Sequence, residues 1–131
     1  MAFAAGAVIT SEGKAIEAAR MVANTQVVPS FMGFGTGATG AARTAAVGDV
    51  ALSTQSGSRI SSTVTNTTTS VTGDTFTAVA TYTAAGSVSI DEIGLFDAAS
   101  GTDKMFVSVT LTPVGLAATD TLQYTINVQY T

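Results

Sequence analysis

The feature that most constrains the fold is a strict two-residue alternation near the C-terminal end of the sequence. Every second position is apolar, with Thr, Gln or Asn between: the apolar residues are Leu122, Tyr124, Ile126, Val128 and Tyr130. Successive side chains of a strand lie on opposite faces of a sheet, so this pattern predicts a strand with one buried face and one solvent-facing face. A weaker alternation recurs in segments 59–65, 75–83, 88–95 and 105–111.

These segments predict a mainly β protein with five or six antiparallel strands, forming a β-sandwich or a barrel-like, jelly-roll-like fold. We expect residues 65–72 to continue in extended form. The expected interruptions are a turn at Gly73-Asp74, a β-bulge at Asp91-Glu92, and a strand end at Pro113 and Gly115. No break in composition divides residues 1–131, so we expect a single domain.

One short N-terminal helix is predicted over residues 11–24. Thr10 and Ser11 are suited to the N-cap, and Glu12 lies in the first turn, where the helix dipole favours an acid. Residues 1–10 are apolar and are expected to form an arm or an edge strand. We expect the helix to cover one open end or edge of the sheets.

The segment after the helix is rich in glycine. Phe31 and Phe34 predict a short strand, and residues 37–57 consist mainly of Gly, Ala, Thr and Ser with little periodicity. This composition predicts a long surface loop that is ordered in part by a partner.

Charge is scarce along the whole chain. Charged residues make up 11% of the 131 residues, against about 25% in ordinary soluble domains. This depletion favours a surface that neighbours cover in an assembly. The five basic residues are scattered: Lys14, Arg20, Arg43, Arg59 and Lys104. We therefore expect no nucleic-acid partner and no membrane partner. The first ten residues lack a basic region, so we expect no signal peptide.

The composition also limits the chemistry. His, Cys and Trp are absent, which excludes Ser-His-Asp and Cys-His arrangements and the usual zinc, copper and iron sites. Gly35, Gly37 and Gly40 spell G-x-G-x-x-G, a dinucleotide fingerprint, but that fingerprint needs a parallel βαβ unit. We interpret the glycines as a loop with positive φ or a close backbone approach, and a nucleotide-dependent enzyme is the alternative. We expect no enzyme activity and no cofactor.

Two other features have a functional and a structural interpretation. Asp97 and Asp103 flank a tight loop that could hold Ca²⁺, although polar turn residues are the commoner explanation. Six aromatic residues could form a sugar platform or belong to the core: Phe31, Phe34, Phe76, Tyr82, Tyr124 and Tyr130.

Several short motifs carry a family resemblance. They are ITSEGKAIEAARM near the start, FMGFGTGAT, Ala51-Leu52, Arg59, DEIGLFDAASG, and the closing apolar strand. In this order they resemble the N-terminal domains of tail-collar and tail-fibre proteins of tailed bacteriophages. The resemblance implies a virion protein, assembled in the host cytoplasm, that forms oligomers, often trimers, on the head, neck or tail with other virion proteins as partners.

Because the sequence stops at Thr131 without a fibre shaft, we expect a capsid decoration or accessory protein. The alternatives are a neck, tail-collar or tail-fibre adaptor, or, in another class, a glycan- or receptor-binding module. The candidate interaction residues are Gly33, Gly35, Gly37, Arg43, Arg59, Glu92 and Asp97. We also expect Ile93, Leu95 and Phe96 in the core, with Glu92 and Asp97 free to pair with Arg59 or with a neighbour.

Overall fold

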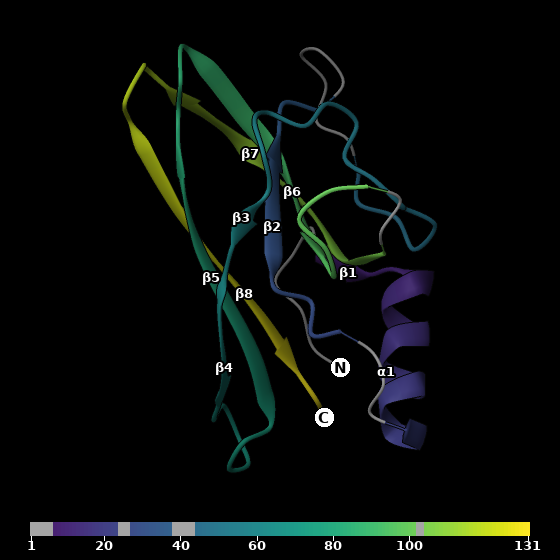
Figure 1. Ribbon diagram of the computed structural model, residues 1–131. Helices are drawn as coiled ribbons and strands as arrows, with labels where there is room; N and C mark the ends of the chain where they lie inside the picture. The colour runs from purple at the N-terminus through teal and green to yellow at the C-terminus, as the bar shows by residue number, and fades with distance from the viewer. Residues whose placement is uncertain (1–6, 24–26, 38–43, 102–103) are drawn as a thin grey trace.

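Two antiparallel sheets and one helix make up the computed structural model, which describes residues 7–23, 27–37, 44–101 and 104–131. The elements are β1 (Ala7–Ile9), α1 (Ser11–Ala23), β2 (Phe31–Gly35), β3 (Ile60–Ser61), β4 (Thr63–Thr67), β5 (Thr75–Thr83), β6 (Val88–Phe96), β7 (Met105–Leu116) and β8 (Thr121–Gln129). One sheet has the order β1-β7-β6-β2-β3 and the other β4-β5-β8 (Figure 1). The predicted antiparallel β-sandwich with one N-terminal helix is confirmed for the described residues.

The core lies between the two sheets and is built by alternation. Ile126 and Val128 of β8 are buried, while the alternating Thr125 and Asn127 are exposed. They join Ile93 and Leu95 of the larger sheet in one apolar cluster. Burying an aliphatic side chain of this size contributes about 1.5–3 kcal/mol, so this cluster accounts for most of the driving force for packing the sheets together.

The number of strands differs from the predicted five or six, because eight are present in the described residues. The segment after Arg59 divides at Ser62, so that β3 pairs with β2 and β4 pairs with β5. One continuous stretch of chain therefore passes from the larger sheet to the smaller one (Figure 1). At the N-terminal end, residues 7–9 form an edge strand on β7 rather than an arm, and residues 1–6 lie outside the described residues.

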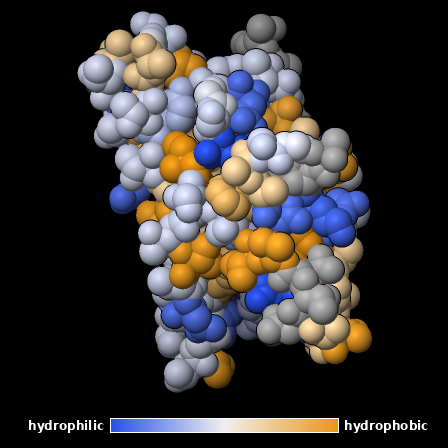
Figure 2. Space-filling model, in the orientation of Figure 1, coloured by the Kyte–Doolittle hydropathy of each residue, from blue (hydrophilic) through white to orange (hydrophobic). Residues whose placement is uncertain are grey.

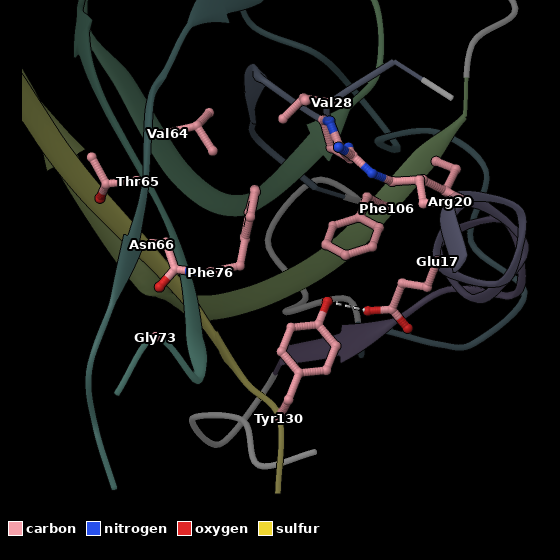
Figure 3. A pocket seen from close by; sticks show the side chains of 12 residues that line it. Glu17, Arg20, Val28, Val64, Thr65, Asn66, Gly73, Phe76, Phe106 and Tyr130 are labelled. Atoms are coloured by element: carbon pink, nitrogen blue, oxygen red, sulfur yellow. Dashed lines mark hydrogen bonds between the residues drawn. The ribbon is translucent and has the colours of Figure 1, made fainter. Parts of the chain in front are cut away.

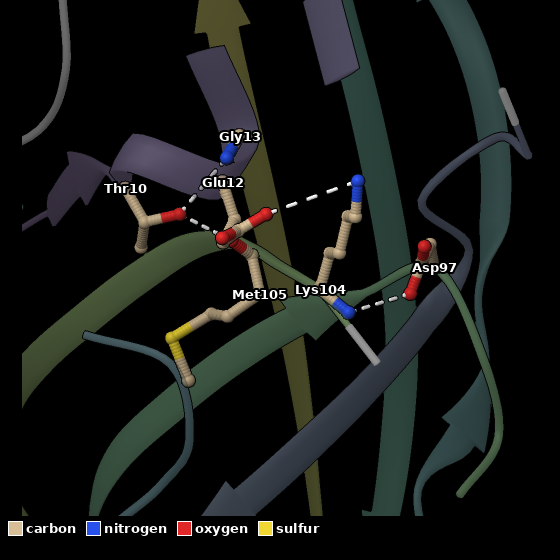
Figure 4. A network of polar contacts seen from close by, with 6 residues as sticks. All are labelled: Thr10, Glu12, Gly13, Asp97, Lys104 and Met105. Atoms are coloured by element: carbon tan, nitrogen blue, oxygen red, sulfur yellow. Dashed lines mark hydrogen bonds and ion pairs between the residues drawn. The ribbon is translucent and has the colours of Figure 1, made fainter. Parts of the chain in front are cut away.

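Helix α1 begins at the predicted cap. The N–H group of Gly13 donates to Oγ1 of Thr10 at 3.0 Å, and the Thr10 hydroxyl donates to the carbonyl oxygen of Met105 (Figure 4). A Cβ atom on Gly13 would collide with the carbonyl oxygen of Phe106, so glycine allows the helix to approach β7 this closely. The helix thus packs against β7 at one end of the larger sheet (Figure 1).

The predicted strand end at Pro113 and Gly115 is wrong, because β7 continues to Leu116. The register between β6 and β7 shifts at Asp91, opposite which β7 has the three residues 111–113. Pro113 lies in this bulge, where its missing N–H group costs no ladder hydrogen bond. The predicted bulge is therefore confirmed, but its extra residues lie on β7.

The predicted extended stretch 65–72 is correct only as far as Thr67, where β4 ends. The residues that follow turn around the carboxylate of Asp74. This carboxylate accepts N–H hydrogen bonds from Thr69 at 2.8 Å and from Ser70 and Val71 at 2.9 Å each. A compact turn thus replaces the last five residues of the expected stretch, 68–72, and the predicted turn at Gly73-Asp74 is confirmed.

Candidate interaction surface

The glycines of β2 and the EIGLFD segment meet on the outer face of the larger sheet. Antiparallel pairing places Gly33 opposite Gly94 and Gly35 opposite Glu92. The chain from Thr44 to Gly57 crosses this face. It is anchored to β2 by two backbone hydrogen bonds, from Thr36 N–H to Thr54 O at 2.9 Å and from Ser56 N–H to Phe34 O at 2.7 Å. The described part of the predicted 37–57 loop is thus held against β2 by hydrogen bonds within its own chain.

Glu92 joins this loop to the sheet. Its side chain is 2% exposed, and Oε1 accepts the N–H group of Thr54 at 2.9 Å. A Cβ atom on Gly35 would lie 2.5 Å from the same Oε1 atom. The absence of a side chain at Gly35 therefore provides the space in which Glu92 reaches the loop.

Arg59 covers the other end of the same face. Its guanidinium carbon lies 3.5 Å from the centroid of the Phe96 ring, and the group donates to Gln55 Oε1 at 3.2 Å and to Ala98 O at 3.1 Å. Burial lowers the pKa of Arg59, and the nearby charge of Asp97 raises it in part. Phe96 is fully buried as expected, but on this outer face and not between the sheets.

The two acidic residues of the candidate set have different partners. Oδ1 of Asp97 accepts the backbone N–H group of Lys104 at 2.8 Å (Figure 4). The charge of Asp97 acts on Arg59 and raises its pKa, whereas the Glu92 carboxylate accepts the N–H group of Thr54. Asp103, the second residue of the possible Ca²⁺ loop, lies outside the described residues.

Asp91 is buried beside the glycine loop. Its Oδ1 atom has no hydrogen-bond partner among the described residues, and burial, followed by the charge of Glu92, raises its pKa. Gly37 has φ of +61°, which confirms the predicted positive φ, and a Cβ there would collide with the Asp91 carboxyl group.

The structure therefore gathers most of the candidate residues on one face, where they hold a loop of the same chain. Gly33, Gly35, Glu92 and Arg59 support the packing of residues 44–57, and Arg43 lies outside the described residues. Within the described residues, these four therefore make contacts inside the chain.

Sequence reasoning missed an exposed apolar patch beside the helix. We define the apolar patch as the following large apolar residues near the C-terminal end of α1 and after it: Met21, Val22, Val27, Val28 and Tyr130. Met21 and Val22 are 88% and 87% exposed. Figure 2 shows a band of apolar side chains across the middle of this face and further apolar side chains at its lower right. Two adjacent apolar pairs in the sequence were the signal. Met21-Val22 do not fit the buried face of the helix, and Val27-Val28 come just before Pro29.

A cavity of about 530 Å³ opens beside the patch. Glu17 and Arg20 line it from α1, while Val64, Asn66 and Phe76 line it from β4 and β5 (Figure 3). The deeper wall includes Phe106, whose ring meets that of Phe76 edge-to-face with centroids 5.8 Å apart. The cavity is thus an apolar recess with a polar rim.

Tyr130 closes one side of this recess. Its hydroxyl group donates to Oε1 of Glu17 at 2.5 Å, which ties the C-terminal segment to the helix (Figure 3). Burial and the hydrogen bond to Glu17 raise the pKa of Tyr130 above its ordinary value. The tyrosine therefore stays neutral and serves as a hydrogen-bond donor at the rim.

The geometry gives little support to a metal site, a dinucleotide site or a sugar platform made of Phe34 and Tyr82. No group of three or more acidic side chains in the described part of the chain could hold a metal ion. β2 pairs antiparallel with both of its neighbours, unlike the first strand of a dinucleotide-binding unit. Phe34 and Tyr82 stack in the core with centroids 5.1 Å apart, so these two rings are not a sugar platform. No described helix is long and apolar enough to cross a membrane.

No protein-family model, curated protein or solved structure matches this chain.

Proposed function

We propose that this chain is a non-enzymatic structural protein of a bacteriophage virion, which decorates the capsid and acts as an oligomer. The observation that carries the proposal is the apolar patch beside an open recess, on a chain with 11% charged residues. The phage-like sequence motifs supply the class of particle. A neck, tail-collar or tail-fibre adaptor would use the same kind of surface and is the alternative placement.

The physical case starts from the cost of exposing apolar area. Each square ångström of apolar surface that a neighbour covers contributes roughly 25 cal/mol, and Met21 and Val22 are the most exposed large apolar side chains of the described residues. The small side chains elsewhere on the surface lose little conformational entropy when they are covered. Such a surface favours lasting contact with other proteins.

A co-sedimentation experiment tests this proposal. The purified chain is mixed with tailed-phage particles that lack it, and the bound fraction is measured. Native mass spectrometry of the free chain gives its oligomeric state. We expect an oligomer that sediments with the particles. A double variant with Met21→Ser and Val22→Ser is expected to bind at least about tenfold more weakly, which corresponds to about 1.4 kcal/mol.

The matched control is Val71→Ser. Val71 is also exposed but lies in the turn between β4 and β5, so binding should stay unchanged. A strictly monomeric chain that stays in the supernatant would rule out the proposal.

A glycan-binding module is the second candidate, because one observation favours it. The recess combines the half-exposed ring of Tyr130 with the polar side chains of Asn66 and Arg20, a combination that suits a sugar ring. A glycan array separates the two functions. Glycan binding that Tyr130→Ala abolishes would favour the glycan-binding module. No glycan binding on the array would favour the structural role.

A further inference from the structure

Strand β8 is an unprotected sheet edge. Within the described residues it pairs only with β5, over nine residues from Thr121 to Gln129, and lies at the end of the smaller sheet (Figure 1). The other described edges are shorter or interrupted: β1 and β3 have three and two residues, β4 has five, and the part of β7 beyond β1 contains Pro113 and a bulge. β8 is therefore the longest regular edge in the described structure.

The backbone groups on the outer side of β8 can be assigned. Tyr130 N–H donates to Asp74 O at 2.9 Å, so the even-numbered residues point their N–H and C=O groups toward β5. Alternation then directs those of Gln123, Thr125 and Asn127 away from the sheet. Unpaired groups in such a row are a template for another strand.

Proteins normally protect an edge of this kind with Lys, Pro, a bulge or an inward-pointing charge. β8 reads TLQYTINVQ and contains no charged residue, no proline and no glycine. Its ladder with β5 is also regular throughout, without a register shift. A protective device is thus missing along the whole strand.

The strand is complementary to itself. In an antiparallel pair of two β8 strands centred on Thr125, each apolar side chain lies opposite an apolar one, Leu122 opposite Val128 and Tyr124 opposite Ile126. On the other face, Gln123 lies opposite Asn127, and no charge meets a like charge. Leu122 and Tyr124 are only half-buried in the single chain, so a second strand would cover apolar area that β5 leaves accessible.

We propose that a second copy of this chain adds its β8 strand antiparallel to β8 about a twofold axis at Thr125, joining two three-stranded sheets into one of six strands. This contact deepens the proposed function, on which it rests, because it specifies how the copies in the oligomer meet. Four residues of the apolar patch lie far from β8 in the sequence and remain available for the particle: Met21, Val22, Val27 and Val28.

A single cysteine tests the contact directly, because the chain contains none. Directly opposite residues in a hydrogen-bonded antiparallel pair have Cα atoms about 5.5 Å apart, within the range that a disulfide spans. Under mild oxidation Thr125→Cys should therefore form a covalent dimer. The matched control is Thr63→Cys, on the edge strand of the opposite side of the sheet, which should remain mostly uncrosslinked.

A charge at the axis tests the same contact in the opposite direction. Thr125→Lys places two like charges face to face, and we expect it to raise the dimer dissociation constant at least about tenfold, while Thr63→Lys leaves it unchanged. Circular dichroism and thermal melting confirm that each variant is folded.

The outcomes separate this contact from the wider proposal. A wild-type oligomer that neither Thr125 variant affects would overturn the β8 contact and leave the virion role standing. If both lysine variants weaken the dimer, the contact is instead a head-to-tail pairing of β8 with β4 of the next copy, and the twofold β8 contact is overturned. A Thr125→Cys dimer that ignores phage particles would support the contact and count against the virion role.

Discussion

At the scale of single residues, glycine creates room for other side chains. Gly35 leaves space for the Glu92 carboxylate, and Gly13 leaves space for the backbone of β7 against the helix. Both are close approaches in regular structure, where the conformational freedom of glycine is a cost that the packing offsets. The glycines near Phe34 therefore mark the place where a loop adheres to a sheet.

Gly35→Ala tests this role. The added methyl group would lie 2.5 Å from Glu92 Oε1 and 2.9 Å from the carbonyl oxygen of Thr54, so the loop must shift. We expect the free energy of unfolding to fall by about 1–3 kcal/mol in urea denaturation. Gly48→Ala is the control, because nothing lies within 4 Å of its Cβ position, and it should change stability by less than about 0.5 kcal/mol. Equal effects of the two substitutions would contradict the steric argument.

At the scale of elements, the turn between β4 and β5 depends on one carboxylate. Asp74 accepts three backbone N–H groups, and these bonds, with that of Val71 the largest contribution, hold its pKa below the ordinary value. The ionised form therefore stabilises the folded state. This contribution is complete above the ordinary pKa of 3.8 and is lost as the pH falls toward the lower folded value.

Asp74→Asn should accordingly lower the melting temperature at neutral pH, with a difference from the wild type that shrinks below about pH 4. Thermal melts followed by circular dichroism across this range provide the measurement. Asp120→Asn is the comparison, because Asp120 accepts only the N–H group of Ala117 in the turn between β7 and β8. It should be the milder substitution, and a pH-independent effect of Asp74→Asn would refute the assignment.

Much of the fold could be predicted from the sequence, because period-two alternation is a local signal. The strand that contains Ile126 follows it closely, β5 follows it from Ala78 to Thr83 but buries Thr75 and Thr77, and the cap at Thr10 follows local hydrogen-bonding rules. The continuation of β7 through Pro113 could not be predicted. It depends on a bulge opposite Asp91, and therefore on pairing between distant segments.

The candidate site was predicted as a set of residues but not as a surface. The EIGLFD segment and the glycines do meet, because β2 and β6 pair. Whether their outer face is open depends on where residues 44–57 go, and a stretch of Ala, Thr and Ser has no periodicity to show that. The exposure of Met21 depends on where the helix packs against the sheets. The spacing of apolar residues along the helix does not predict that position.

At the scale of the whole molecule, sparse charge sets how assemblies should respond to salt. Interactions between exposed charges are screened beyond about 10 Å at 0.1 M salt, whereas apolar contacts and backbone hydrogen bonds are not. With 11% charged residues and none in β8, we expect the oligomer to persist from low to high sodium chloride. Sedimentation velocity over that range measures it. Dissociation at high salt would instead indicate an interface held by ion pairs.

The passage of the chain from β3 to β4 at Ser62 has a mechanical consequence. A covalent link joins the two sheets along that side, and the N–H group of Ser62 is also bonded to Ser30 O at 2.7 Å. Two further short connections join the same two sheets, from β5 to β6 and from β7 to β8. With three covalent links between them the sheets cannot separate as rigid layers, so the amide hydrogen of Ser62 should exchange with deuterium only as slowly as the whole sandwich unfolds.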